Sequence, residues 1–342
     1  MKATILDVAR VAGVSKGTVS LVVNDSGAIK PQTRARVHQA IEKLHYVPDE
    51  SARELTTRRK RILGSVFLTS DDGGSCYLVG SPVETLFHET YTGISWGLAR
   101  TKYGLVNQRF PLKEQGKRLP GIVESNRIAG LFLIGGLCTE GFIRQILETG
   151  LPCVIVGNSH RQLDSVDVDV GMAAYLAVKH LIDRGHRRIA FINGPDESTT
   201  SAGKRQGFRD ALEDAGIECN ERLLSKADCT GEAGYRALRD LWKFRRSMTA
   251  LFCAHDRIAA GAMRFLYDSR VRIPDDFSIV GCEHSLIAEY PVPALTTVKI
   301  FKERMGEEAC GLLLKRIENP DRKVSHVTLK PELVVRDSTG AP

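Results

Sequence analysis

Polar side chains recur at helical spacing near the start of this 342-residue chain. Lys16, Ser20 and Asn24 carry an amine, a hydroxyl and an amide about one turn apart, and Gly17 and Leu21 fall on the same face. Such groups can hydrogen-bond to base edges and phosphate oxygens, and small residues let a helix enter a groove deeply. The pattern therefore predicts a helix that reads the major groove of double-stranded DNA.

The residues around this segment indicate how it is held. Thr4 followed three residues later by Asp7 is a capping-box pattern that starts a first helix. Gly13 supplies a tight turn, Ser15 can cap a second helix, and Pro31 suits the first turn of a third. Two helices separated by about three residues are typical of a helix-turn-helix. The alternative is any pair of short helices joined by a glycine.

The apolar residues predict one small core under these helices. Val19, Val22 and Val23 share the side of the second helix opposite the polar face, and we expect them to pack on Val8 and Val11. The third helix adds a buried stripe made of Val37, Ala40, Ile41 and Leu44.

The next segment narrows the interpretation. It reads Tyr46-Val47-Pro48-Asp49-Glu50-Ser51-Ala52-Arg53-Glu54-Leu55, and with the preceding helices it resembles the lactose/galactose repressor family of bacterial transcription regulators. The resemblance implies a DNA-binding headpiece over residues 1–48 and a hinge helix and linker over 49–61. It also implies that Ala52 and Leu55 enter the minor groove, where the leucine wedges between base pairs and kinks the duplex. The alternative for Leu55 is an ordinary linker residue.

The residues expected to bind DNA come from all of these segments. They are Thr4, Ser15, Lys16, Gly17, Thr18, Ser20, Leu21, Asn24, Lys30, Thr33, Tyr46, Ala52 and Leu55. The charge distribution supports them, because residues 1–61 contain 12 Lys and Arg against 6 Asp and Glu, which is +6 of the chain's formal +7. An excess of basic residues of this kind attracts a phosphate backbone.

The remaining residues, from 62 onward, exceed what a single hydrophobic core normally organises, so we expect two lobes. No run approaches the roughly 18 apolar residues of a membrane span, and no signal peptide is recognisable, so the expected location is the cytoplasm. Eight cysteines are scattered without a Cys-x-x-Cys pair. This spacing favours reduced thiols over a disulfide framework or a zinc site, and we expect neither metal nor cofactor.

Apolar runs alternate with amphipathic helices along this region, which is typical of parallel sheets in doubly wound lobes. The expected strands are 62–68, 130–134, 153–156, 189–192, 250–253 and 277–281, and the expected helices include 172–183, 204–214, 256–267 and 302–317. The fold class is thus an α/β core preceded by an all-α helix-turn-helix domain.

Three segments resemble the core of the same repressor family, which is itself similar to periplasmic sugar-binding proteins: residues 185–192, 272–281 and 293–298. The resemblance implies two lobes joined by three crossovers, an effector cleft between them, and a homodimer formed through the core. Within a core of residues 62–340, the N-terminal lobe would comprise about 62–159 and 294–320, and the C-terminal lobe about 160–293 and 321–340.

The resemblance also locates an expected effector site. Asp256 follows a strand and could accept two ligand hydroxyls, although an aspartate there could instead cap a helix. Lys204, with Arg205 beside it, stands where the family usually has an arginine, and an ammonium cannot form a bidentate fork. Further differences from the family at this site are Cys229, Glu283, His284 and, in a long loop after the first strand, Asp71. A carboxylate and an ammonium facing one cavity would suit a sugar acid or a sugar phosphate.

The sequence contains no phosphate-binding loop, zinc-protease helix or nucleophile elbow, so we expect no enzyme. We instead expect a dimeric repressor of carbohydrate-related genes that binds a pseudo-palindromic DNA operator and responds to a small-molecule effector. Two alternatives remain open: a core that responds to a protein partner, and a solute-binding protein.

Overall fold

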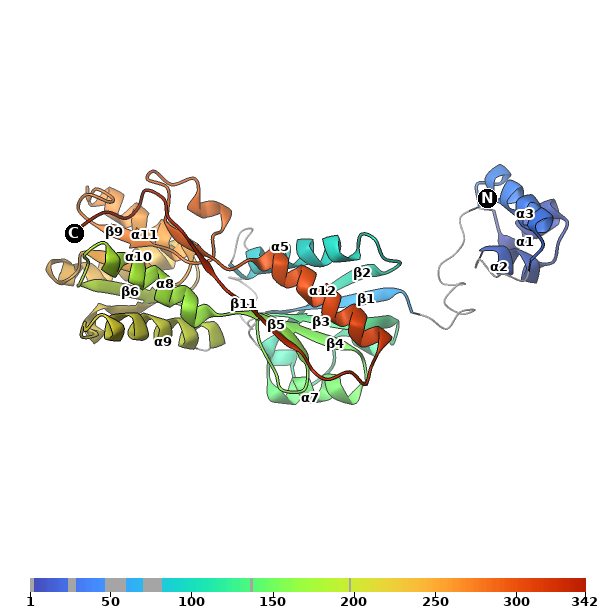
Figure 1. Cartoon of the computed structure of the whole chain (residues 1–342), viewed down its shortest axis with the longest axis horizontal. Helices are drawn as coiled ribbons and strands as arrows, with labels where there is room; N and C mark the ends of the chain where they lie inside the picture. Colours follow the sequence, from blue (N-terminus) through green and yellow to red (C-terminus); the bar gives the residue numbers. More distant parts are fainter. Residues whose placement is uncertain (1–2, 24–28, 47–59, 70–81, 136–137, 197) are drawn as a thin grey trace. The chain divides into compact units, whose positions relative to one another are not determined.

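The computed structural model describes residues 3–23, 29–46, 60–69, 82–135, 138–196 and 198–342. The chain divides into two compact units, Met1–Arg61 and Ile62–Pro342 (Figure 1). Among the helices of these described ranges, none has both the length and the apolar character needed to cross a membrane.

The first unit contains three helices. They are α1 (Ile5–Ala12), α2 (Lys16–Val23) and α3 (Pro31–Lys43). The capping box at the start of α1 is confirmed: the Asp7 amide donates to Thr4 Oγ1 at 3.3 Å and the Thr4 amide donates to Asp7 Oδ2 at 3.0 Å. Gly13 ends α1 with φ +63°, a left-handed conformation that glycine adopts without the steric penalty of a Cβ. The helix-turn-helix is therefore confirmed.

The headpiece core differs from the prediction at one position. Its buried residues are Val8, Ala9, Ala12, Val19, Val22, Val37 and Ala40, and Val23, Ile41 and Leu44 are partly buried against them. Val11 is 43% exposed, so its expected packing on α2 is wrong. Ala12 takes that place because it lies four residues after Val8, on the same face of α1.

The second unit contains two parallel sheets and a short antiparallel ribbon. The strands are β1 (Ile62–Thr69), β2 (Gly104–Pro111), β3 (Ile128–Ile134), β4 (Cys153–Val156), β5 (Asp164–Val168), β6 (Ile189–Asn193), β7 (Leu224–Lys226), β8 (Ala250–Cys253), β9 (Ser278–Val280), β10 (Thr297–Lys299), β11 (His326–Leu329) and β12 (Glu332–Val334). The six-stranded sheet has the order β11-β5-β4-β3-β1-β2, the four-stranded sheet β7-β6-β8-β9, and β10 pairs antiparallel with β12. The predicted α/β class is confirmed.

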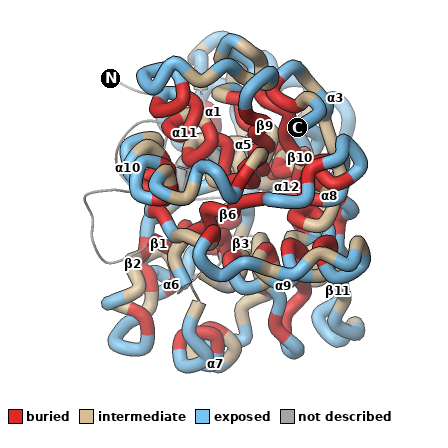
Figure 2. The backbone as a smooth tube through the Cα atoms, turned by 90° about the vertical axis from the view of Figure 1, so that its left-hand side faces the viewer, coloured by how far each residue is buried: buried red, intermediate tan, exposed pale blue. Residues whose placement is uncertain are grey.

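Helices cover both faces of each sheet, and their bounds are α5 (Pro82–Leu98), α6 (Gly121–Glu124), α7 (Glu140–Glu148), α8 (Val170–Asp183), α9 (Thr199–Asp214), α10 (Gly231–Leu241), α11 (Asp256–Asp268) and α12 (Lys302–Glu318). In the N-terminal lobe α5 and α12 lie on one face of the sheet and α7 on the other (Figure 1). Helices α8 and α9 cover one face of the C-terminal sheet, and α10 and α11 cover the other. Buried positions are concentrated in the strands and the helix faces that contact them (Figure 2).

The expected lobe boundaries need correction. Strand β5, expected in the C-terminal lobe, belongs to the six-stranded sheet, and β11 pairs with it in parallel as the edge strand. Strand β10, expected in the N-terminal lobe, instead forms parallel bridges to the C-terminal lobe, between Val280 and Thr296 and between Glu283 and Lys299. The crossovers therefore lie after β5, after β10 and after β11. Short polar edge strands such as β11 carry little sequence signal.

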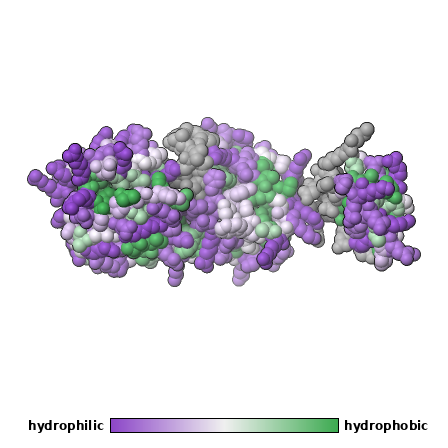
Figure 3. Space-filling view, turned by 90° about the horizontal axis from the view of Figure 1, so that it is seen from above, coloured by the Kyte–Doolittle hydropathy of each residue, from purple (hydrophilic) through white to green (hydrophobic). Residues whose placement is uncertain are grey.

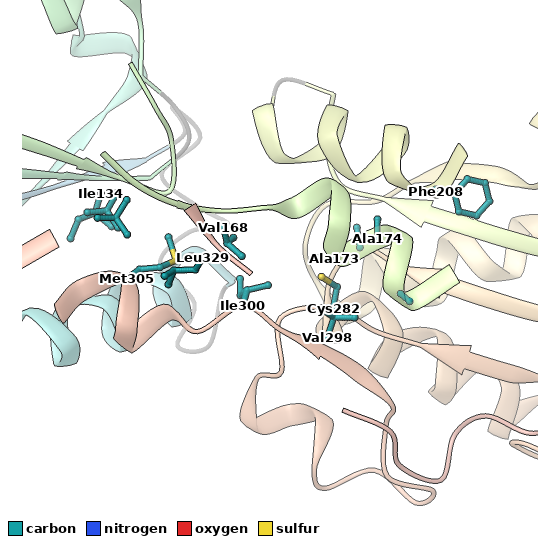
Figure 4. Packing of buried hydrophobic residues seen from close by; sticks show 14 of the residues in the cluster. Ile134, Val168, Ala173, Ala174, Phe208, Cys282, Val298, Ile300, Met305 and Leu329 are labelled. Atoms are coloured by element: carbon teal, nitrogen blue, oxygen red, sulfur yellow. The ribbon is translucent and has the colours of Figure 1, made fainter. Parts of the chain in front are cut away.

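One buried cluster continues from one lobe to the other. Figure 4 shows Ile134 and Met305 on the side of the N-terminal lobe, Val168, Leu329 and Ile300 at the crossovers, and Ala173, Cys282 and Val298 on the side of the C-terminal lobe. The face of the molecule in Figure 3 is mainly hydrophilic and has separate hydrophobic patches. Because this cluster is continuous, the crossover residues pack against buried residues of both lobes.

Candidate functional site

The first candidate site is the outer face of α2. Lys16 and Gly17 are exposed, Leu21 is 43% exposed and Ser20 is half-buried, so this helix presents the predicted residues away from the core. The opposite face of α2 holds these residues in place, because Val19 and Val22 are buried in the headpiece core. Asn24 lies outside the described residues.

Other predicted DNA contacts have local roles in the headpiece. The Ser15 hydroxyl accepts from the Thr18 amide at 3.1 Å, which caps α2, and it lies 2.9 Å from the Thr18 hydroxyl. Lys30 precedes α3 and is exposed, whereas Thr33 and Tyr46 are half-buried, the tyrosine against the headpiece core. Ala52 and Leu55 lie outside the described residues, and the hinge contact stays a prediction.

The second candidate site lies where strands of the C-terminal lobe end. Lys204 of α9 is 3% exposed, and its ammonium donates to the carbonyl of Ala254, just after β8, at 2.7 Å. His255 follows as the N-cap residue of α11, and its Nδ1 lies 2.6 Å from Oε1 of Glu283, just after β9. The carboxyl ends of neighbouring parallel strands meet at one edge of a sheet, which explains why residues distant in sequence converge here.

The pKa shifts of His255 and Glu283 both favour the charged form of this pair. Burial disfavours the imidazolium, but the electrostatic interactions of the ring with its neighbours, Cys229 and Glu283, outweigh burial and raise the pKa of His255 to about 9. Burial also disfavours the Glu283 carboxylate, but His255, with help from Lys302 and Lys204, lowers its pKa to about 2. Both side chains are 11% exposed, so solvent screens this ion pair weakly.

The backbone at this pair is strained. Glu283 has φ +112° and His284 has φ +53°, and such conformations cost non-glycine residues roughly 1–3 kcal/mol each. Strand β10 holds them, because the Glu283 amide donates to the Val298 carbonyl at 2.8 Å and the His284 amide donates to Thr297 Oγ1 at 3.3 Å. Strain of this kind is concentrated at functional sites.

A buried cation from the N-terminal lobe, not predicted from the sequence, joins this cluster. Lys302 is 2% exposed, and its Nζ lies 3.1 Å from Oε2 of Glu89 of α5. The ammonium finds no hydrogen-bond acceptor in suitable geometry among the described residues. Burial disfavours the ammonium, but Glu283 and Glu89 raise the pKa of Lys302. The raised pKa favours the charged form of Lys302, and the N–H groups of its ammonium are available to a ligand.

Close packing of α5 on α12 sets the position of Lys302. A Cβ added to Gly93 would lie 1.8 Å from the Glu303 carbonyl oxygen, so only glycine permits this approach. The sequence did contain a signal for Lys302, since it is the first residue of α12 and a cation is unfavourable at the positive end of a helix dipole. In Figure 4 Met305 and Ile300, which flank Lys302 in the sequence, and Cys282, which precedes Glu283, belong to the same buried cluster.

Asp256 has hydrogen-bond partners within the protein, and its predicted contact with the effector stays a prediction. It is fully buried, and its carboxylate accepts from the Ser285 amide at 2.7 Å, from the Ser285 hydroxyl at 3.0 Å and from the Thr297 hydroxyl. Burial raises its pKa to about 6 despite these hydrogen bonds. The helix-cap alternative is also not observed, because His255 is the N-cap residue. Asp256 thus joins α11 to the strained loop and to β10, and its carboxylate oxygens accept hydrogen bonds from groups of the protein itself.

Four other residues were predicted to contact the effector: Arg205, His284, Cys229 and Asp71. Arg205 pairs with Asp196 and is 37% exposed, and it lies about 100° around α9 from Lys204, so the structure does not bring it to the cluster and its effector contact stays a prediction. His284 Nε2 lies 3.1 Å from the guanidinium of Arg336, which follows β12, and burial together with Arg336 lowers the pKa of His284. Cys229 does belong to the cluster, since its interaction with the imidazole is among those that raise the pKa of His255. Asp71 lies outside the described residues.

The described cluster therefore contains Lys204, His255, Glu283, Lys302, Glu89 and Cys229. Two ammonium groups and an imidazolium face two carboxylates, and the loop that carries Glu283 is strained. The arrangement can hydrogen-bond a polar ligand and can neutralise a negative group on it. It draws on both lobes of the second unit.

Two family models match the chain. A model described as bacterial regulatory proteins, lacI family, matches residues 4–49, and one described as a periplasmic binding protein-like domain matches residues 178–339. These ranges contain the α2 face and the His255–Glu283 pair respectively.

Curated relatives match over nearly the whole chain. The HTH-type transcriptional regulator CelR of Thermobifida fusca is 32% identical over 335 residues, which cover 97% of this chain and 96% of that protein. The HTH-type transcriptional repressor PurR of Proteus mirabilis is 34% identical over 343 residues, which cover 98% and 96%. The relatives are regulators rather than enzymes.

Solved structures agree with the sequence matches. A complex of the transcriptional regulator CelR with cellobiose has 31% identity and a TM-score of 0.71, and the match covers 98% of this chain and all of that one. A lac repressor dimer bound to operator and the anti-inducer ONPF has 25% identity and a TM-score of 0.85 over the full length of both chains.

Proposed function

The chain belongs to the lacI family of bacterial regulatory proteins, and from that premise we propose which of its residues bind DNA and effector. It is a DNA-binding transcriptional regulator with a small-molecule effector site in its core. We assign DNA recognition to the exposed face of α2, chiefly Lys16, Gly17, Ser20 and Leu21. We also propose that it acts in the cytoplasm, where a bacterial DNA-binding regulator meets its operator.

We further propose that two copies repress carbohydrate-related genes by binding a pseudo-palindromic operator. The support is the relative that is a lac repressor dimer bound to operator. Two-fold pairing of the protein imposes the same symmetry on its site, with one headpiece per half-site.

Leu21→Arg is expected to introduce a guanine into each half-site selected from random DNA. An arginine on this face can bond guanine O6 and N7, whereas leucine offers only apolar contact, and a good bidentate pair discriminates by about 1–3 kcal/mol. The measurement is in vitro selection followed by sequencing, with wild type giving an inverted repeat.

Val11→Arg is the matched control for this experiment. Val11 and Leu21 are both 43% exposed, and each change adds one positive charge, but Val11 lies on α1. It should strengthen binding to all sequences equally, through phosphate attraction. A guanine gained equally in both variants, or no inverted repeat with wild type, would contradict the assignment of α2.

For the effector we propose a hydroxylated ligand that carries a carboxylate or phosphate, such as a sugar acid or sugar phosphate. The observation that carries this proposal is the buried Lys302 ammonium, which has unused donors beside Lys204, His255 and Glu283. The cellobiose bound by the CelR relative supports a carbohydrate. Glu283 would accept from ligand hydroxyls, and the two lysines would bind the anionic group.

In a thermal-shift screen of neutral sugars against their acid and phosphate derivatives, we expect the anionic member of a pair to stabilise the core. A ligand at 100 times its dissociation constant stabilises a protein by about 2.7 kcal/mol. Lys302→Met and Lys204→Met should each remove the preference for the anion. The preference is read as the ratio of the two dissociation constants in calorimetric titration.

Arg205→Met serves as the control, since it removes a cation from the same helix, α9, outside the cluster. It should leave the anion preference unchanged. Equal stabilisation by neutral and anionic members would contradict the anionic class. No stabilisation by any of them would favour a core that responds to a protein partner.

A further inference from the structure

Exposed cations gather at the amino ends of the strands of the C-terminal lobe, on the edge of the sheet opposite the candidate effector site. Residues 184–188 lead into β6 and residues 242–249 lead into β8, and these two strands are neighbours. The segments touch, because the Thr249 amide donates to the Arg188 carbonyl at 2.8 Å. We call the exposed cations of the two segments the basic rim: Arg184, Arg187, Arg188, Lys243, Arg245 and Arg246.

The protein does not compensate the charge of the basic rim locally. Neither segment contains an aspartate or a glutamate. The acidic residues nearest to them in the sequence, Asp183 and Asp240, pair with Lys179 and Arg239 instead. Within the part of the core that the structure describes, the side chains of the rim are therefore available to an anion from outside.

The charge of the whole core shows how concentrated the rim is. Residues 62–342 have a formal charge of only +1, which is the +7 of the chain less the +6 of residues 1–61. When the six cations of the rim are set apart from this +1, the rest of the core carries −5. The rim is thus the positive end of a core that is otherwise acidic, and such an asymmetry attracts polyanions to one place.

Two arginines of the rim are held in position by the protein itself. Arg187 Nη1 donates to the carbonyls of Ile182 at 3.0 Å and of His186 at 3.2 Å. Arg184 Nε donates to His180 Nε2 at 3.2 Å. A guanidinium has five N–H groups, so both arginines keep donors for an anion. Fixing these side chains in advance lowers the entropy that binding costs.

We propose that the basic rim binds the sugar-phosphate backbone of a second segment of duplex DNA, without reading its sequence, while the headpiece binds the first. This surface goes beyond the proposed function, since neither the α2 face nor the effector cluster includes it. Lysine and arginine side chains that neutralise phosphates release counterions, which supplies affinity for any sequence. A second segment of the same DNA molecule has a high effective concentration once the headpiece is bound.

The composition of the rim favours DNA over an acidic protein as the partner. Protein–protein interfaces have an apolar and aromatic centre, whereas protein–DNA interfaces are more polar and much more positively charged. In the described part of the chain, none of the exposed large apolar side chains lies in either rim segment. Trp242 and Phe244 are half-buried; Trp242 packs on Phe265 and Phe277, and Lys243 Nζ lies 5.1 Å from the centre of the Phe244 ring. The rim therefore offers charge and little apolar area, as a phosphate backbone requires.

The first test measures capture of a second duplex by the full-length protein. A short duplex of random sequence is immobilised and saturated with protein, and binding of a labelled duplex of the same kind is followed at several salt concentrations. One variant combines four changes: Arg187→Gln, Arg188→Gln, Arg245→Gln and Arg246→Gln. It should bind the labelled duplex more weakly, and its slope of log K against log salt should be smaller by about 3–4, because each phosphate contact contributes about 0.9.

The matched control removes four cations of the same lobe that each pair with a carboxylate: Lys179→Gln, Arg236→Gln, Arg239→Gln and Arg264→Gln. It changes the net charge by the same amount and should keep the wild-type capture and the wild-type slope. Equal losses in the two variants would show that net charge alone matters, and an unchanged slope in the rim variant would show that the rim does not contact phosphates. Either result would overturn the proposal.

Photocrosslinking of the wild type needs no variant, so it decides the matter even if the substitutions impair folding. With a random duplex that carries photoreactive groups on its phosphates, mass spectrometry should find crosslinks in residues 184–188 or 242–249 as well as in the headpiece. Crosslinks confined to the headpiece would overturn the proposal. So would their removal from the rim by an oligoglutamate peptide at an equal concentration of negative charge, which would indicate an acidic protein partner. The α2 assignment is tested separately, by the selection with Leu21→Arg.

Discussion

Asp256→Ala is expected to lower the free energy of unfolding of the core by about 3 kcal/mol, because it leaves three buried donors without their acceptor. Those donors are the Ser285 amide and hydroxyl and the Thr297 hydroxyl. The same change should disorder the strained loop at Glu283 and so also weaken effector binding. The measurement is urea unfolding of the full chain followed by tryptophan fluorescence.

Asp268→Ala is the matched control, since Asp268 ends the same helix and only pairs with Arg264 at the surface. It should change stability little. If the two variants proved equally stable while only Asp256→Ala lost the effector, Asp256 would be a ligand-binding residue after all. Thr297→Val removes one of the three donors together with its need for an acceptor, and should therefore cost less than Asp256→Ala.

The second large effect concerns pH. His255 has its pKa raised from 6.5 to about 9 in the folded protein, so its contribution is complete below 6.5 and is lost as the pH rises through 9. Glu283 has its pKa lowered from 4.5 to about 2, so its contribution is present above 4.5 and is lost as the pH falls through 2. The pair therefore stabilises the core most between 4.5 and 6.5.

We expect the wild type to lose about 2 kcal/mol more than Glu283→Gln between about pH 6 and about pH 10, as measured by chemical denaturation. The comparison with the variant removes the contribution of other groups that titrate in this range. Parallel pH dependences in the two proteins would show that the pair is not charged in the folded state.

The order of elements along the chain was predictable because the signals are local. Thr4 and Asp7 start α1, Gly13 ends it and Ser15 caps α2, and each interaction spans at most a few residues. In the core, apolar runs separated by amphipathic helices identified six strands of the two parallel sheets. The α2 face followed in the same way, since helical spacing alone places Lys16, Gly17 and Leu21 together.

The charged site needed the tertiary structure. The sequence placed Lys204 and Glu283 in the site, but only the fold shows that Asp256 is occupied by Ser285 and Thr297, and that Lys302 and Glu89 approach from the other lobe. The crossovers were also misplaced, because β11 joins the N-terminal sheet from a distant part of the chain.

By itself, then, the sequence determined the helix-turn-helix, the alternation of strands and helices, and the residue types available to bind DNA and ligand. The tertiary structure decided which of those residues meet. The physical reason is range: caps, turns and periodicity act over a few residues, whereas the partner of a buried charge is chosen by packing between segments far apart in the chain. A lone aspartate or lysine in a sequence looks the same whether the fold leaves its charge to a ligand or satisfies it within the protein.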